Sequence, residues 1–92
     1  MKKIIILGST GSIGTQALDI VRANPQKYQV AGLAAGKNVD IIENQVREFG
    51  IKYVALFDEN AARDLKLRLS DTDTVVLSGA DGVCELASLE CD

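Results

Sequence analysis

The segment from Lys3 to Gly14, KIIILGSTGSIG, constrains the fold of this 92-residue chain more than any other. A run of branched apolar residues, IIIL, leads directly into a loop with glycines at positions 8, 11 and 14. An apolar run without alternation is typical of a strand buried on both faces in a parallel sheet covered by helices. An apolar helical pattern begins near Ser12, so the order strand, glycine loop, helix predicts a dinucleotide-phosphate site.

The rest of the chain repeats this alternation of strand and helix. Further strands are expected at Tyr28–Ala35, Lys52–Phe57 and Thr74–Leu77. Helices are expected from Ser12 to Asn24-Pro25, from Val39 to Gly50, after Asp58, and from about Ala80 or Asp81 through Leu86 and Leu89 to the end. The pattern predicts an α/β fold, a Rossmann-like doubly wound parallel sheet truncated to about four βα units. Right-handed crossovers favour the strand order 3-2-1-4, with the first strand central and the fourth at an edge.

Local signals add detail to these elements. Asn38 and Asp58 are placed to cap the second and third helices, and Gly50 to end the second. The apolar spacing of the first helix assigns four residues to the face that lies on the sheet. These residues are Ile13, Ala17, Ile20 and Val21.

Composition excludes several classes of protein. The net charge is −3 and lysine and arginine do not cluster, which argues against a nucleic-acid partner. Apolar runs near the N-terminus are too short for a signal peptide or a membrane span, so we expect a cytoplasmic protein. Cys84 and Cys91 are separated by about 10.5 Å of helical rise, too far for a disulfide. We expect reduced thiols, with Cys84 packed, and no metal site, because histidine is absent.

Each glycine of the loop has an expected role. Gly8 allows the turn out of the strand, Gly11 lets a pyrophosphate approach the backbone, and Gly14 lets the helix lie close to the sheet. The N–H groups expected to face the anion at the helix start are those of Thr10, Gly11, Ser12 and Ile13. The hydroxyls expected to add donors are those of Ser9, Thr10 and Ser12. The spacing G-x-x-G-x-x-G departs from the usual G-x-G-x-x-G fingerprint.

The loop after the second strand indicates which dinucleotide binds. Sites for NAD place an acidic residue there to bind the ribose 2′-hydroxyl. Here the loop reads Gly36, Lys37 and Asn38, with no acid and with a lysine that attracts a 2′-phosphate. This favours NADP over NAD, and the alternative is that Lys37 is simply a solvated loop residue.

The combination of GSTGSIG, an NP pair and VAGLAAGKN resembles the N-terminal part of the 1-deoxy-D-xylulose 5-phosphate reductoisomerase family, over all 92 residues. The resemblance implies an enzyme that isomerises this sugar phosphate and reduces it with NADPH to 2-C-methyl-D-erythritol 4-phosphate, in non-mevalonate isoprenoid biosynthesis. It also implies a divalent metal, Mg²⁺ or Mn²⁺. The implied NADPH contacts are Thr10, Gly11, Ser12, Ile13, Gly36, Lys37 and Asn38.

The resemblance also implies what this chain lacks. Family metal ligands, the substrate-phosphate site and the lid lie in later parts of the enzyme, so we assign no catalytic or metal residue here. Residues 1–92 are then a partial NADP-binding domain, inactive alone, and the alternative is a complete four-strand domain. Three other functions stay open. They are another NADP-dependent reductase, a non-catalytic nucleotide-binding module, and a structural fragment that forms a homo-oligomer through its fourth strand.

Overall fold

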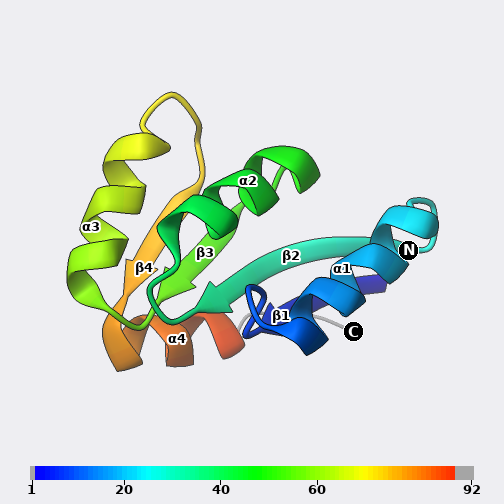
Figure 1. The fold of residues 1–92 in the computed structure, drawn as a ribbon, viewed down its shortest axis with the longest axis horizontal. Helices are drawn as coiled ribbons and strands as arrows, with labels where there is room; N and C mark the ends of the chain where they lie inside the picture. Colours follow the sequence, from blue (N-terminus) through cyan, green and yellow to red (C-terminus); the bar gives the residue numbers. More distant parts are fainter. Residues whose placement is uncertain (1, 89–92) are drawn as a thin grey trace.

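The computed structural model describes residues 2–88, in which strands and helices alternate (Figure 1). The strands are β1 (Lys2–Leu7), β2 (Tyr28–Ala35), β3 (Tyr53–Leu56) and β4 (Val75–Ser78). The helices are α1 (Ser12–Ala23), α2 (Val39–Phe49), α3 (Glu59–Arg68) and α4 (Gly79–Ala87). Every expected element is present, with start positions that differ by at most two residues. Leu89 and Cys91, which were expected on the last helix, lie outside the described residues.

The four strands are parallel and follow the order β1-β2-β3-β4. The expected order 3-2-1-4 is therefore wrong: β1 lies at an edge of the sheet, and β3 lies inside it. The handedness rule could not separate the two orders, because both can be built with right-handed crossovers. β4 does lie at an edge, as expected, but next to β3 rather than next to β1.

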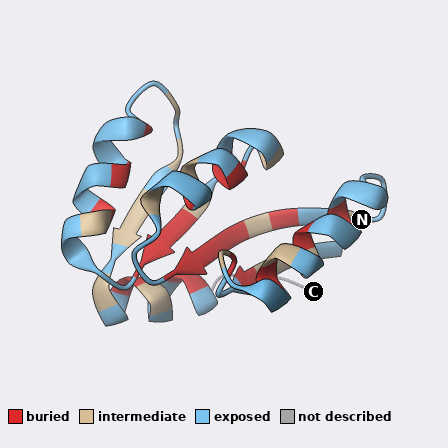
Figure 2. Ribbon diagram, in the orientation of Figure 1, coloured by how far each residue is buried: buried red, intermediate tan, exposed pale blue. Residues whose placement is uncertain are grey.

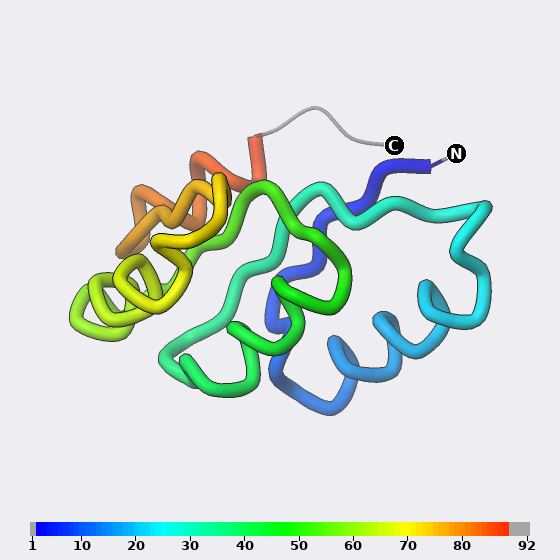
Figure 3. Tube along the Cα trace, turned by 90° about the horizontal axis from the view of Figure 1, so that it is seen from above, coloured from blue at the N-terminus to red at the C-terminus, as the bar shows by residue number. Residues whose placement is uncertain are grey.

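The helices cover both faces of the sheet unequally. α1, α2 and α3 all contribute to one apolar core on one face, whereas Leu86 of α4 packs on the other face against Ala34 and Ala55. Figure 3 shows α4 on the opposite side of the sheet from α1 and α2. The helix after β4 is therefore the first to lie on the second face of the sheet. The order 3-2-1-4 would instead place the helix after β3 on that face.

Burial follows strand position in the sheet. Most of β2 and all but the first residue of β3 are buried (Figure 2), because each has a neighbour on both sides. In β1 only Ile6 is buried, and Leu7 is 58% exposed. The expectation that the first strand is buried on both faces is thus wrong for the described residues, because β1 is an edge strand.

The inner face of α1 also differs from the prediction. Ile13 is 83% exposed and Ile20 is 57% exposed, while Leu18 and Val21 are buried. The cause is Gly14, which lies buried at the start of the same face and brings the helix against the preceding loop. Leu18 and Val21 follow Gly14 at helical spacings of four and seven, which places Ile13 and Ile20 beside this face rather than on it.

The predicted helix ends are confirmed. Asn38 Oδ1 accepts the N–H of Ile41 at 3.3 Å, and Asp58 Oδ1 accepts the N–H groups of Asn60 and Ala61 at 2.9 and 3.2 Å. Gly50 ends α2 with φ of 62°, a left-handed conformation that glycine adopts without strain. The local sequence therefore determines where α2 and α3 begin and where α2 ends.

Ion pairs join neighbouring helices on the surface. Arg22 of α1 binds Glu48 of α2, with Nη2 2.9 Å from Oε1. Arg47 of α2 binds Asp71, which follows α3, with Nη2 3.0 Å from Oδ1. Each arginine lowers the pKa of its carboxylate partner, chiefly through the side-chain hydrogen bond. All four side chains are exposed, so each pair contributes little to stability.

Candidate nucleotide-binding site

The glycine loop forms a compact turn beyond the carboxyl end of β1. Gly8 has φ of 79°, which confirms the expected need for glycine at the exit from the strand. The N–H groups of Gly8 and Ser9 both donate to the Ala34 carbonyl at the end of β2, at 2.7 and 3.0 Å. The loop is therefore held against the neighbouring strand by backbone hydrogen bonds.

Gly14 and Gly11 have different structural roles. A Cβ atom on Gly14 would lie 2.1 Å from Gly8 O and 2.6 Å from Ser9 Cα, so the expected close approach of helix and loop is confirmed. A Cβ on Gly11 would lie 3.5 Å from Gly8 O, an ordinary contact. Packing within the chain therefore requires glycine at position 14 but not at position 11, where the exposed backbone faces outward.

The predicted N–H donors are not all available. Gly11 N–H donates to Gly8 O at 3.1 Å, so this amide is used inside the loop. Ser12 and Ile13 open α1, where first-turn N–H groups have no intrahelical acceptor. No side chain of the described residues caps this helix, and the N–H of Thr10 has no acceptor among them. Three of the four predicted amides thus remain able to bind an anion.

One of the three hydroxyls predicted to bind the ligand is buried instead. The Ser9 side chain is fully buried, so it does not reach a ligand as the sequence analysis expected. Ser12 is exposed and Thr10 is half-buried. No local signal distinguishes these three residues, because Ser9 is buried by α1 and by a residue of α2 that is distant in sequence.

The second predicted loop lies directly beyond β2, next to the glycine loop. Gly36, Lys37 and Asn38 are all exposed, and Lys37 forms no ion pair with any residue between 2 and 88. The Gly36 carbonyl accepts the N–H of Asp58 at 3.0 Å, which ties this loop to the end of β3. The structure therefore brings both predicted loops together at the carboxyl ends of the parallel strands.

An apolar hollow of about 310 Å³ lies between the two loops. Its lining residues are Leu7, Gly8, Ala34, Ala35, Gly36, Phe57 and Val83. Phe57 is 61% exposed, so its ring is accessible from the hollow that it lines. Phe57 and Val83 were not among the predicted site residues; the signal for Phe57 was an aromatic residue at the end of the expected third strand.

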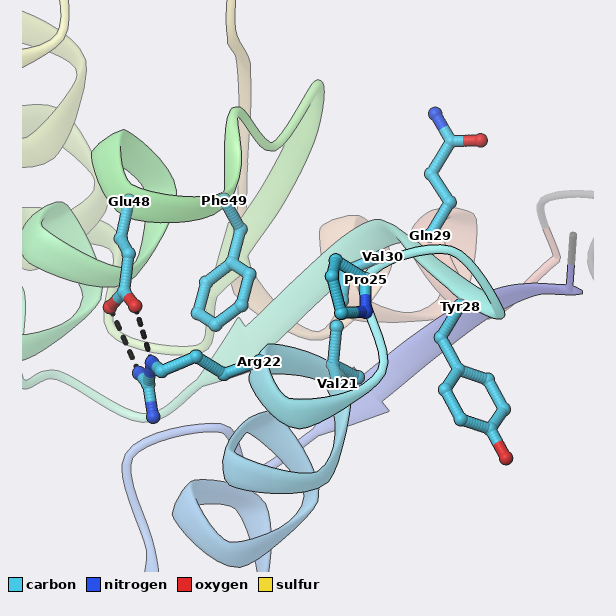
Figure 4. A pocket seen from close by; sticks show the side chains of 8 residues that line it. All are labelled: Val21, Arg22, Pro25, Tyr28, Gln29, Val30, Glu48 and Phe49. Carbon is cyan, nitrogen blue, oxygen red and sulfur yellow. Dashed lines mark hydrogen bonds and ion pairs between the residues drawn. The ribbon is translucent and has the colours of Figure 1, made fainter.

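A larger hollow, of about 450 Å³, lies at the other end of the sheet, where β2 begins (Figure 4). The Arg22 guanidinium on its wall is bound to Glu48 and lies 5.2 Å from the centre of the Phe49 ring. The two charged side chains that line this hollow, Arg22 and Glu48, are therefore already paired with each other. We place the candidate site at the glycine loop, where amides and a lysine are unpaired within residues 2–88.

The described residues include one exposed thiol. No group of three or more metal-ligating side chains occurs within residues 2–88. Cys84 is a free thiol and is exposed, so the expectation that it is packed is wrong. None of the helices in this range is long and apolar enough to cross a membrane.

Comparison with known proteins identifies the family. Residues 4–92 match the sequence profile of the family described as 1-deoxy-D-xylulose 5-phosphate reductoisomerase. The chain belongs to this reductoisomerase family. Its reductoisomerase relative from Desulfitobacterium hafniense strain Y51 is 58% identical over 83 residues, which cover 90% of this chain and 22% of that protein. The reductoisomerase of Thermodesulfovibrio yellowstonii is 47% identical over 90 residues, 98% of this chain and 23% of that protein.

Solved reductoisomerase structures share the fold. The Zymomonas mobilis enzyme in complex with NADPH has a TM-score of 0.92 and 31% identity, with 98% of this chain and 24% of that chain covered. A DOX-P reductoisomerase in complex with NADPH, fosmidomycin and magnesium gives a TM-score of 0.92 and 33% identity, with 98% and 22% covered. The resemblance expected from GSTGSIG and AGKN is confirmed, and the chain spans less than a quarter of the length of these relatives.

Proposed function

We propose that this chain supplies part of the NADPH site of a 1-deoxy-D-xylulose 5-phosphate reductoisomerase. The observation that carries this proposal is the side-by-side placement of the two predicted loops at the carboxyl edge of the sheet. One loop offers unpaired amides at a helix start, and the other offers an exposed lysine without an ion-pair partner within residues 2–88. A solved family member that shares this fold was obtained with NADPH bound.

The pyrophosphate is assigned to the start of α1. The N–H groups of Thr10, Ser12 and Ile13 would donate to its oxygens, and the helix dipole favours the negative charge there. Gly11 contributes its exposed backbone surface rather than its N–H, which already binds Gly8 O. The Ser12 hydroxyl is exposed and adds a side-chain donor.

The 2′-phosphate is assigned to Gly36, Lys37 and Asn38. The Lys37 ammonium supplies the charge, and Gly36 has open space around its Cα that lets a ligand approach the backbone. Asn38 uses its side-chain oxygen to cap α2, which leaves its amide NH₂ as a donor. The apolar hollow beside these residues, with the exposed Phe57 ring, suits the flat face of an adenine.

The whole protein would then use NADPH to reduce the isomerised sugar phosphate to 2-C-methyl-D-erythritol 4-phosphate. NADPH supplies the hydride, and Mg²⁺ or Mn²⁺ would hold substrate oxygens. We assign no catalytic or metal-binding role to residues 1–92, and we propose that this segment is a partial NADP-binding domain without turnover of its own. Supporting this, the chain corresponds to 22–24% of its relatives' length.

Calorimetric titration of the 92-residue chain with NADPH, and in parallel with NADH, tests the proposal. We expect NADPH to bind with a clear preference over NADH, because only NADPH carries the 2′-phosphate. Circular dichroism of the same sample shows whether the chain is folded. A folded chain that binds neither dinucleotide would contradict the assignment of the pyrophosphate and the 2′-phosphate to these two loops.

A further inference from the structure

A polar side chain lies on the buried face of α2. The buried residues of this helix are Ile42, Gln45 and Val46, and Gln45 is only 8% exposed. Its Nε2 donates to the backbone carbonyl of Ser9 at 2.8 Å, in a buried hydrogen bond. This bond connects the middle of α2 to the glycine loop.

The hydrogen bond determines the orientation of one peptide unit. The Ser9–Thr10 peptide is trans, as are all peptide bonds described. In a planar trans peptide the C=O and the following N–H point in opposite directions. Because the Ser9 carbonyl points to Gln45, the Thr10 N–H points away from α2, and it has no acceptor among the described residues.

The glutamine pairs one buried oxygen and leaves two others unpaired. Gln45 Oε1 and the Ser9 hydroxyl are both buried without a hydrogen-bond partner within residues 2–88. Buried polar atoms without partners are unfavourable. A methionine of similar size would fill the same space without the orphan oxygen, but it would leave the Ser9 carbonyl without its donor.

We propose that Gln45 is a positioning residue that holds the Ser9–Thr10 peptide so that the Thr10 N–H faces the cofactor pyrophosphate. This inference rests on the proposed NADPH function. Gln45 and the helix cap Asn38 are seven residues apart, about two turns of the same helix. α2 therefore positions the glycine loop through Gln45 and the 2′-phosphate loop through its own first turn.

The test compares Gln45→Met with Asn44→Ala, an exposed neighbour on the same helix, in the 92-residue chain. The ligands are NADPH and adenosine 2′-monophosphate, which has the 2′-phosphate but no pyrophosphate. We expect Gln45→Met to weaken NADPH binding about three- to tenfold, the effect of one lost hydrogen bond. Binding of adenosine 2′-monophosphate should be unchanged, and Asn44→Ala should change neither.

Two further measurements separate positioning from general damage. NADPH should shift the Thr10 amide resonance in a ¹H–¹⁵N spectrum of the unchanged chain, and this shift should shrink in Gln45→Met. Gln45→Glu removes the donor while its carboxyl is ionised and restores an O–H donor when protonated. NADPH binding by Gln45→Glu should therefore improve as the pH falls, relative to Asn44→Ala.

Each other outcome overturns the inference. Unchanged NADPH affinity in a folded Gln45→Met variant would show that Gln45 does not position the loop. An equal loss for NADPH and adenosine 2′-monophosphate would indicate a purely structural role. If the unchanged chain binds neither NADPH nor inorganic pyrophosphate, the proposed function fails, and the inference fails with it.

Discussion

A Cβ atom on Gly14 would lie 2.1 Å from the carbonyl oxygen of Gly8. The atoms that the added Cβ would meet belong to the backbone, so no side chain can move aside. Either α1 or the glycine loop must therefore shift. We expect Gly14→Ala to lower the free energy of unfolding by about 1–3 kcal/mol and to weaken NADPH binding. Urea denaturation measures the first effect and calorimetry the second. Gly36→Ala is the stability control, because nothing lies within 4 Å of its added Cβ.

Lys37→Ala tests the 2′-phosphate assignment. NADPH binding should weaken by about 1.5–3 kcal/mol, the range of a charged hydrogen bond, while NADH binding should barely change. Lys27→Ala is a matched control, since Lys27 is also exposed but precedes β2 at the opposite end of the sheet. Equal losses for both dinucleotides would show that Lys37 does not recognise the 2′-phosphate.

The cap of α3 can be tested through Asp58. Asp58→Ala removes an acceptor from the N–H groups of Asn60 and Ala61, so the free energy of unfolding should fall by about 1 kcal/mol. Asp58→Ser keeps a capping oxygen and should restore most of that loss. The cap would be unimportant if chemical denaturation gave the same midpoint for Asp58→Ala and the unchanged chain.

The surface ion pairs predict how stability depends on pH. Arg22 lowers the pKa of Glu48, and Arg47 lowers the pKa of Asp71, each chiefly through its hydrogen bond. A carboxylate with a lower pKa in the folded state stabilises the fold above its unfolded pKa, of about 4. This contribution is lost as the pH falls through the folded pKa.

The melting temperature should accordingly decline by a small amount between about pH 5 and pH 3, as followed by circular dichroism. Glu48→Gln and Asp71→Asn together should make the decline shallower, because neither amide titrates. Added salt should reduce the difference, since both pairs are exposed. An identical pH profile for the double variant would mean that other carboxylates cause the acid sensitivity.

Interactions within a few residues made part of this protein predictable. The cap at Asn38, the cap at Asp58 and the left-handed Gly50 each depend on neighbours no more than four residues away. The tight turn at Gly8 and the close approach at Gly14 belong to a motif of similarly short range. For this reason the amino-acid sequence alone indicates the element bounds, two of the glycine roles and the family resemblance.

Contacts between distant segments decided the rest. The amphipathic pattern of α3 is compatible with either face of the sheet, and only its packing with α2 and β3 places β4 beyond β3. The burial of Ser9 depends on Gln45, and the hollow beside Phe57 depends on strands and a helix that meet at one edge. The sequence by itself determined the elements, their caps and the phosphate-binding motif. The tertiary structure decided the strand order, the outward face of α1 and the amides left free, because these depend on which surfaces pack together.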